Sequence, residues 1–183
     1  MTSAPQRSFI IKAIAAVALT GALVGCSTTD RGRAPALQRN ASWVVLPFDN
    51  NTETPLAGNR AEAIAEALLH AQGVGNVKRY TAASQQDALF GNGDQGGRDA
   101  AMAWAREQGA EYALTGAVDE WRYKVGVDGE PAAGVALRII DLKTGNTVWS
   151  GAGGKSGWSR EALSSVAQKL MRRLLSSGLS NAQ

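Results

Sequence analysis

Apolar and polar positions follow two different periods along the chain, and their order predicts alternating strands and helices. A short apolar run, Trp43-Val44-Val45-Leu46, is closed by Pro47 and is typical of a buried strand. Thr54 and Pro55 have the residue types preferred at a helix N-cap and at the first helical position. Apolar residues then recur at helical spacing up to Gly73. The folded region is therefore expected to begin with a strand and a helix.

The rest of the chain continues this alternation and ends in antiparallel strands. The expected elements are a strand at 77–80, helices at 81–89 and 99–108, a strand at 112–127, a hairpin of 134–141 with 148–157, and a helix from Ser159. Gly145 supplies the positive φ that the hairpin turn requires. The predicted fold class is α/β, one domain over residues 42–183, in which helices flank a mixed sheet with an antiparallel meander.

The amino terminus has the pattern of a secretory leader. Arg7 and Lys12 precede an uncharged apolar run, Ala13–Val24, which is shorter than the roughly 20 residues of a membrane-spanning helix. The run ends in Leu-Val-Gly-Cys26, which matches the bacterial lipobox, whose cysteine thiol receives diacylglycerol. We therefore predict a signal peptide over residues 1–25, lipidation of Cys26 and stable membrane anchoring by the acyl chains.

The residues after Cys26 carry two further expectations. Ser27, rather than an aspartate, follows the cysteine, which favours sorting to the outer membrane. Residues 26–41 are polar, mixed in charge and without periodicity, so they are predicted to form a flexible tether. A flexible chain of about 15 residues spans roughly 20 Å on average, which would keep the domain close to its membrane.

Composition narrows the range of functions. The chain has 19 Lys and Arg against 16 Asp and Glu; two basic residues, Arg7 and Lys12, lie in the leader, which leaves 17 against 16. This nearly neutral balance argues against nucleic-acid binding. With His70 and Cys26 as the single histidine and cysteine, we expect neither enzyme activity nor a metal or other cofactor. Gly91–Gly96 spells G-x-G-x-x-G, but no strand pattern precedes it, so a flexible loop is the favoured interpretation.

Three segments resemble one family of bacterial envelope proteins. They begin at Trp43 (WVVLPFDN), Gly109 (GAEYALTGAV) and Asp141 (DLKTGNTVW), and the last is the most specific. They are similar to the TolB N-terminal/CsgG/LpoB-like superfamily, and within it to the lipoproteins of Pel-type exopolysaccharide export. The resemblance implies an oligomeric ring on the periplasmic face of the outer membrane. Such a ring would guide a cationic polysaccharide to an export porin.

A second member of the same superfamily remains open as an alternative. The LpoB-type lipoproteins activate a penicillin-binding protein, and they must reach through peptidoglycan toward the inner membrane. That reach requires a long disordered tether, and the predicted tether, residues 26–41, is short. The length of this segment therefore favours the export lipoprotein.

Acidic residues near the predicted long strand are the candidates for contact with a cationic polymer. Apolar residues occupy one phase of the strand before Asp119 and the other phase after Glu120, which predicts a β-bulge or a register change near these two residues. Carboxylates at such a break either project into a ring lumen or are solvated charges beside a turn. The candidates for an acidic lining are Asp119, Glu120, Asp128 and Glu130, with Asp119 the first choice.

Tryptophan gives the remaining candidate, a membrane-facing residue. Trp149 follows Val148 in the predicted hairpin, so the two side chains are expected on opposite faces. If the compact Val148 packs inward, Trp149 lies outside and one copy per subunit forms an aromatic belt on a ring. The competing interpretation places Trp149 in the core. Trp158 is assigned to a staple with Leu163, and Trp43 and Trp104 to the core.

Overall fold

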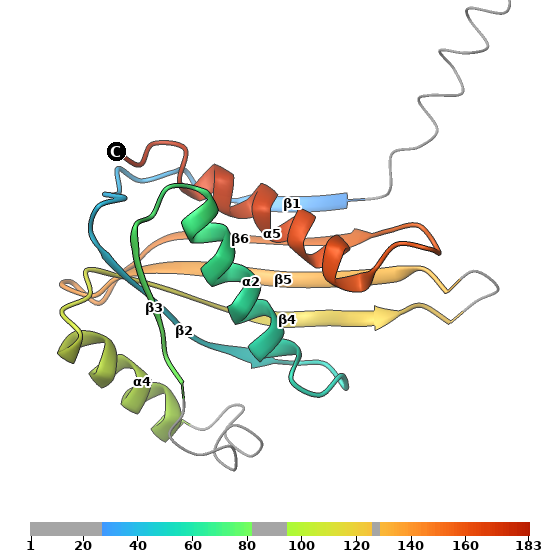
Figure 1. Cartoon of the computed structure of the whole chain (residues 1–183), viewed down its shortest axis with the longest axis horizontal. Coiled ribbons are helices and arrows are strands. Elements are labelled where there is room, and N and C mark those ends of the chain that lie inside the picture. Colours follow the sequence, from blue (N-terminus) through green and yellow to red (C-terminus); the bar gives the residue numbers. More distant parts are fainter. Residues whose placement is uncertain (1–26, 82–94, 126–128) are drawn as a thin grey trace, which may run out of the picture.

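The computed structural model describes residues 27–81, 95–125 and 129–183, and these form a six-stranded mixed sheet with three helices (Figure 1). The sheet order is β1-β6-β5-β4-β2-β3. The elements are β1 (Ser27–Arg31), β2 (Ser42–Asn50), α2 (Ala57–Ala71), β3 (Asn76–Arg79), α4 (Gln95–Glu107), β4 (Tyr112–Tyr123), β5 (Pro131–Asp141), β6 (Thr147–Ser156) and α5 (Leu163–Gly178). The predicted helix at 81–89 and most of the G-x-G-x-x-G segment, Asp128 and Cys26 lie outside the described residues.

The sheet combines a parallel half and an antiparallel half. β2 pairs in parallel with β3 and β4, whereas β4, β5, β6 and β1 pair antiparallel in turn. The predicted meander and the α/β class are confirmed. Gly145 has φ 74° in the turn between β5 and β6, as that tight hairpin connection requires.

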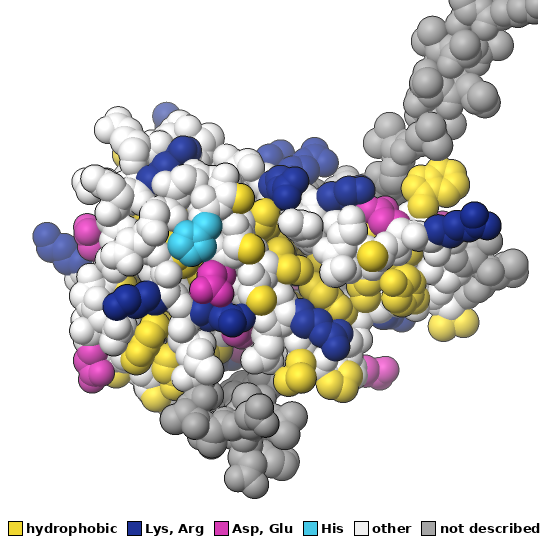
Figure 2. All heavy atoms as spheres, in the orientation of Figure 1, with side chains coloured by type: hydrophobic (Ala, Val, Ile, Leu, Met, Phe, Trp, Pro, Cys, Tyr) yellow, Lys and Arg dark blue, Asp and Glu magenta, His cyan; other side chains and the backbone are white. Residues whose placement is uncertain are grey.

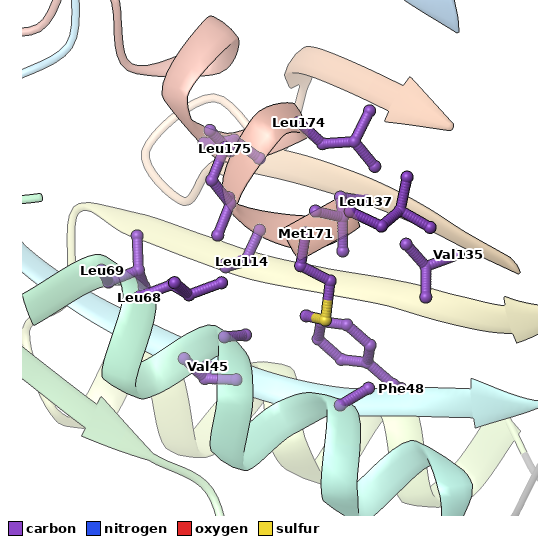
Figure 3. Close-up of a cluster of buried hydrophobic side chains, with 14 of the residues drawn as sticks. Val45, Phe48, Leu68, Leu69, Leu114, Val135, Leu137, Met171, Leu174 and Leu175 are labelled. Carbon is purple, nitrogen blue, oxygen red and sulfur yellow. The ribbon is translucent and has the colours of Figure 1, made fainter. Parts of the chain in front are cut away.

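Two helices cover one face of the sheet and enclose the main core. α2 and α5 lie side by side across it, and Figure 3 shows their leucines meeting side chains of β2, β4 and β5. Leu68 and Leu69 come from α2, whereas Met171, Leu174 and Leu175 come from α5; all five are buried. Alternation along β2 sends Trp43 and Val45 into this core.

The opposite face of the sheet is covered over only part of its width by the described helices. Val44 and Leu46 of β2 face a smaller cluster that contains Ala101 and Ala105 of α4. α4 contacts β2, and no described helix lies over the central part of β4, β5 and β6 on this side. One face is therefore a helix-covered core, and the other is partly bare.

The expected tether is wrong over most of its length. Ser27–Arg31 forms the edge strand β1, which pairs antiparallel with Lys155–Gly151 of β6. Further along, Leu37 and Ala41 are buried, and Gln183 donates a backbone hydrogen bond to the carbonyl of Leu37. The pattern did not reveal this because an edge strand with a solvated face does not need an apolar sequence.

The strand boundary at Pro47 and the two later helix starts also differ from expectation. β2 continues past Pro47 because a register shift between Val45 and Phe48 leaves the proline exposed outside the regular ladder. α2 begins at Ala57, after Leu56 in a left-handed conformation, rather than at Pro55. α5 begins at Leu163 rather than Ser159, so Trp158 has no first helical turn to staple.

The bulge in β2 creates a backbone donor that a buried carboxyl group satisfies. Oε1 of Glu62, on α2, accepts a hydrogen bond of 2.9 Å from the backbone N–H of Phe48. Glu62 is 7% exposed. Desolvation by burial raises its pKa above the usual 4.5, although the Phe48 hydrogen bond and the charge of Arg79 oppose the rise. Burial therefore favours the protonated form in the folded state.

Glu62 should make folding stability depend on pH. Because its folded pKa is raised, its stabilising contribution is complete below about 4.5 and is lost as the pH rises through the folded value. Glu62→Gln keeps an acceptor for Phe48 without a charge, so the variant should gain stability relative to wild type between pH 4.5 and neutrality. Urea unfolding of both proteins across this range measures the difference.

A second substitution at the same position controls for the hydrogen bond. Glu62→Ala should cost about 1–3 kcal/mol, since the N–H of Phe48 loses its acceptor. A pH-independent difference between Glu62→Gln and wild type would contradict the raised pKa.

Candidate functional site

Exposed apolar side chains gather at one end of the sheet. The four large exposed hydrophobic residues among those described are Leu56, Tyr123, Val125 and Trp158. β2 and β4 end here, α2 and α5 begin here, and the loop after β6 carries Trp158 (Figure 1). Figure 2 shows hydrophobic surface at this right-hand end of the molecule. We call these four residues the apolar end.

Hydrogen bonds tie together the segments that carry the apolar end. The backbone N–H of Leu163 donates to the Tyr123 hydroxyl over 3.2 Å, which joins the start of α5 to the end of β4. Lys124 Nζ donates to Ser156 Oγ over 2.7 Å. The Thr54 hydroxyl donates to the carbonyl of Trp121, which fixes the turn before α2 against the same strand. The exposed residues therefore stand on connected segments.

The start of β1 lies at this same end. Ser27 is the register partner of Lys155, three residues before Trp158. Trp158 is 61% exposed and Tyr123 is 53% exposed, whereas most apolar side chains of the β-strands are buried. The residue that directly follows Cys26 is thus fixed at the end of the sheet that carries Trp158 and Tyr123.

The prediction that Trp149 faces outward is wrong. Its side chain is 2% exposed and belongs to the main core. A register shift between Ile139 and Ile140 leaves Val148 without a partner on β5, so the strict alternation of the hairpin fails at this point. Val148 packs partly against the same core, and Trp149 pairs with Ile139.

Glycines make the slot that holds Trp149. A β-carbon at Gly151 or at Gly178 would come within 2.8 Å of the indole ring. Gly151 lies on the same strand, and Gly178 ends α5 above it. Because these two residues have no side chain, the strand and the end of the helix can close over the indole ring. Among the other tryptophans, Trp43 is in the main core as predicted, and Trp104 is partly buried in the smaller cluster.

The acidic candidates lie on the hairpin of β4 and β5 but point to different places. The predicted bulge is present between Val118 and Glu120, and Asp119 is the extra residue. Asp119 is exposed and accepts a hydrogen bond of 2.8 Å from Asn51 Nδ2. Glu120 forms an ion pair with Arg122 at 3.1 Å. Glu130, the residue directly before β5, is exposed.

This hairpin is mixed in charge rather than acidic in a single copy. Arg122 and Lys124 are exposed next to the candidate acids. Asp119 is exposed and its partner is an amide, whereas Glu120 is paired with the cation of Arg122. A surface attractive to cations therefore requires the repetition of Asp119 and Glu130 by several copies.

Metal-ligand clusters and membrane-spanning helices were both sought among the described residues. They contain no group of three or more His, Cys, Asp or Glu side chains arranged to hold a metal ion. Within the same residues no helix has the length and apolar character to cross a bilayer.

Comparison with solved structures identifies the family. The chain is 41% identical to a chain of the PelC dodecamer from Paraburkholderia phytofirmans, with a TM-score of 0.72; the match covers 86% of this chain and 99% of that one. This chain belongs to the PelC family. A variant of the same PelC dodecamer, in which one leucine is replaced by methionine, matches at 43% identity and a TM-score of 0.71, with the same coverage.

A family model and a more distant solved structure also match this chain. The model of the family described as peptidoglycan-synthase activator LpoB matches residues 26–154. Lipoprotein GNA1162 from Neisseria meningitidis shares the fold at 19% identity and a TM-score of 0.52, over 77% of this chain and 99% of that one. Comparison with curated proteins gives no match.

Trp149 and Trp158, the two tryptophans of this PelC-family chain whose positions differ from prediction, provide a matched test of which ring is packed and which is exposed. Trp149→Ala should lower the free energy of unfolding by about 3–5 kcal/mol, because it empties the slot between two glycines. Trp158→Ala removes an exposed ring and should change the free energy by no more than about 0.5 kcal/mol. Chemical denaturation of both variants measures the contrast. Equal losses would show that Trp158 is packed, or that Trp149 is not.

Proposed function

We propose that this protein is an outer-membrane lipoprotein of a Pel-type exopolysaccharide export apparatus and that its copies assemble into a periplasmic ring. The observation that carries the proposal is the identity of more than 40% to the PelC dodecamers, which covers 99% of each of those chains. A relative this similar over its full length has the same fold, which supports the same mode of assembly for this chain. The protein acts by binding and guiding, not by catalysis.

The apolar end is the part of the domain that faces the membrane. Cys26 carries the acyl chains, and Ser27 directly after it is fixed to β6. The lipids therefore enter the bilayer at the end of the sheet that carries Trp158, Tyr123 and Val125. Tryptophan and tyrosine favour the membrane–water interface, where the ring is partly buried and its polar group stays hydrated. The membrane-facing role that the sequence predicted for Trp149 is therefore assigned to Trp158 in this proposal.

Polymer guidance rests on the carboxylates that each copy contributes to the ring. Asp119 and Glu130 are exposed on the β4–β5 hairpin, and Asp128 lies between these strands in the sequence. A circle of such groups attracts a cationic polysaccharide through many weak contacts. Because dissolved salt screens each contact, the polymer is not trapped on its way to the export porin.

The matching family model keeps the LpoB-type activator as the second candidate function. An activator of a penicillin-binding protein must extend far from the outer membrane. In this chain, residues 27–31 are a strand of the sheet and Leu37 is buried, so this segment supplies little free reach. This observation favours the export lipoprotein.

Lipidation is tested at Cys26. Cys26→Ser removes the thiol that accepts diacylglycerol, so the variant should accumulate as unprocessed or soluble protein and should be lost from the outer-membrane fraction. Membrane fractionation with labelled palmitate measures both effects. Ser27→Ala is the matched control and should fractionate as wild type. Normal acylation and outer-membrane fractionation of Cys26→Ser would contradict the anchor.

Polymer guidance is tested at Asp119. Asp119→Asn keeps the size of the side chain and its acceptor oxygen for Asn51, but it removes one charge from every copy. Export of the polysaccharide in a strain that carries the variant should fall, while the melting temperature and the assembled mass stay unchanged. Glu107→Gln, at the exposed end of α4, is the control. Export at the wild-type level in Asp119→Asn, and also in a variant that lacks Glu130, would exclude these carboxylates.

A further inference from the structure

The partly bare face of the sheet carries a row of small side chains. Register pairing aligns Ala117 of β4, Ala136 of β5 and Ala152 of β6 across the strands. Their neighbours Val118, Val135 and Leu137 point into the main core, so the three alanines point to the other side. Ala117 and Ala136 are half-buried, and Ala152 is exposed. We call these three residues the alanine row.

Aspartates occupy the two ends of this row. Asp49 of β2 pairs with Ala117, and Asp30 of β1 pairs with Ala152. Asp49 is bound to Arg98 of α4 at 2.6 Å. Asp30 is exposed and forms no ion pair with another described residue. The row itself is thus small, with an available negative charge at its β1 end, and the exposed Arg138 lies on the same face two residues along β5 from Ala136.

The outer side of the helix layer has matching properties. Ala63, Ala67 and Ala71 are exposed on α2 at a spacing of four residues, where a surface helix normally carries polar side chains. On α5, Arg172 and Arg173 are exposed, and neither forms an ion pair among the described residues. Figure 2 shows hydrophobic and basic side chains side by side on this face.

The arrangement of the two surfaces fits a head-to-tail contact. α5 lies over β5, β6 and β1, and α2 lies over β2 and β4. A second copy stacked with its bare face on this layer would set its alanine row across α2 and α5, and its Asp30 near Arg172 and Arg173. Alanine on alanine allows close approach of backbones, and the charges fix the direction of the contact.

We infer that the alanine row of one copy docks on the α2–α5 layer of the next copy. This inference rests on the proposed ring, and it identifies the surfaces that build it. A closed ring needs two different surfaces on opposite sides of each copy, and a ring of twelve turns by about 30° from one copy to the next. The two faces of one sheet meet this requirement. The dodecameric state of the similar PelC structures supports a second copy as the occupant.

Single substitutions on either surface should block assembly. In the full chain purified in detergent, Ala136→Arg and Ala67→Arg should each remain monomeric at a concentration at which wild type is fully assembled, as native mass spectrometry measures. Ala36→Arg adds the same charge to an exposed site outside both surfaces and should assemble as wild type. If Ala136→Arg fails to fold by circular dichroism, Ala152→Arg, at the most exposed position of the row, replaces it.

A mixture of the two variants tests the pairing itself. Ala136→Arg retains an intact helix layer, and Ala67→Arg retains an intact bare face, so one good contact remains. The mixture should give a species of twice the monomer mass and nothing larger. A second readout reverses the charges: Asp30→Arg should weaken assembly, and adding Arg172→Asp with Arg173→Asp should restore it.

The outcomes separate this inference from the proposed function. If wild type assembles and the two arginine variants assemble equally well, the ring stands and the assigned surfaces are wrong. A mixture that stays monomeric also overturns the pairing. If wild type itself is a monomer at every concentration, the proposed ring fails.

Discussion

The antiparallel pairing of β1 with β6 is the interaction on which the placement of this domain relative to the proposed lipid anchor depends. It takes Ser27–Arg31, which would otherwise be free chain, and fixes them to the edge of the sheet. A free segment of this polar character would let the domain tumble within roughly 20 Å of its anchor. Pairing removes that freedom and holds Ser27 beside the loop of Trp158. Orientation relative to Cys26 therefore follows from backbone hydrogen bonds at one sheet edge, and not from the length of a linker.

Much of the fold could be predicted because its strands and helices have local signals. The apolar run at Val44, the spacing along α2 and the turn at Gly145 each gave the correct element type. The bulge at Asp119 was also visible, since apolar residues change phase there and a register shift occurs at that position. These features depend on neighbours within a few residues, and sequence patterns record such neighbours directly.

The errors arise where distant segments decide the structure. Trp149 was misplaced because the alternation argument assumed an unbroken ladder, whereas a register shift isolates Val148. The slot for the indole also requires Gly178, which is 29 positions away in the sequence and belongs to α5. β1 has no apolar pattern, and only its partner strand makes it part of the sheet. Trp158 became exposed because α5 begins four residues later than its sequence suggested.

The proposed membrane-facing end and the proposed assembly surfaces are compatible, because the first lies at the strand ends and the others lie on the two faces of the sheet. The apolar end lies where strands β2, β4 and β6 finish, whereas the alanine row and the α2–α5 layer lie on the two faces. Copies stacked head to tail, with the bare face of one on the helix layer of the next, would therefore keep their strand ends on one rim. In the proposed ring, each copy would add its Trp158 and the acyl chains of Cys26 to that rim, so a modest attraction per copy would be multiplied by the number of copies. Asp119 and Glu130 belong to a hairpin that ends at the same rim, which brings the carboxylates of neighbouring copies close to the point where a polymer would reach the membrane.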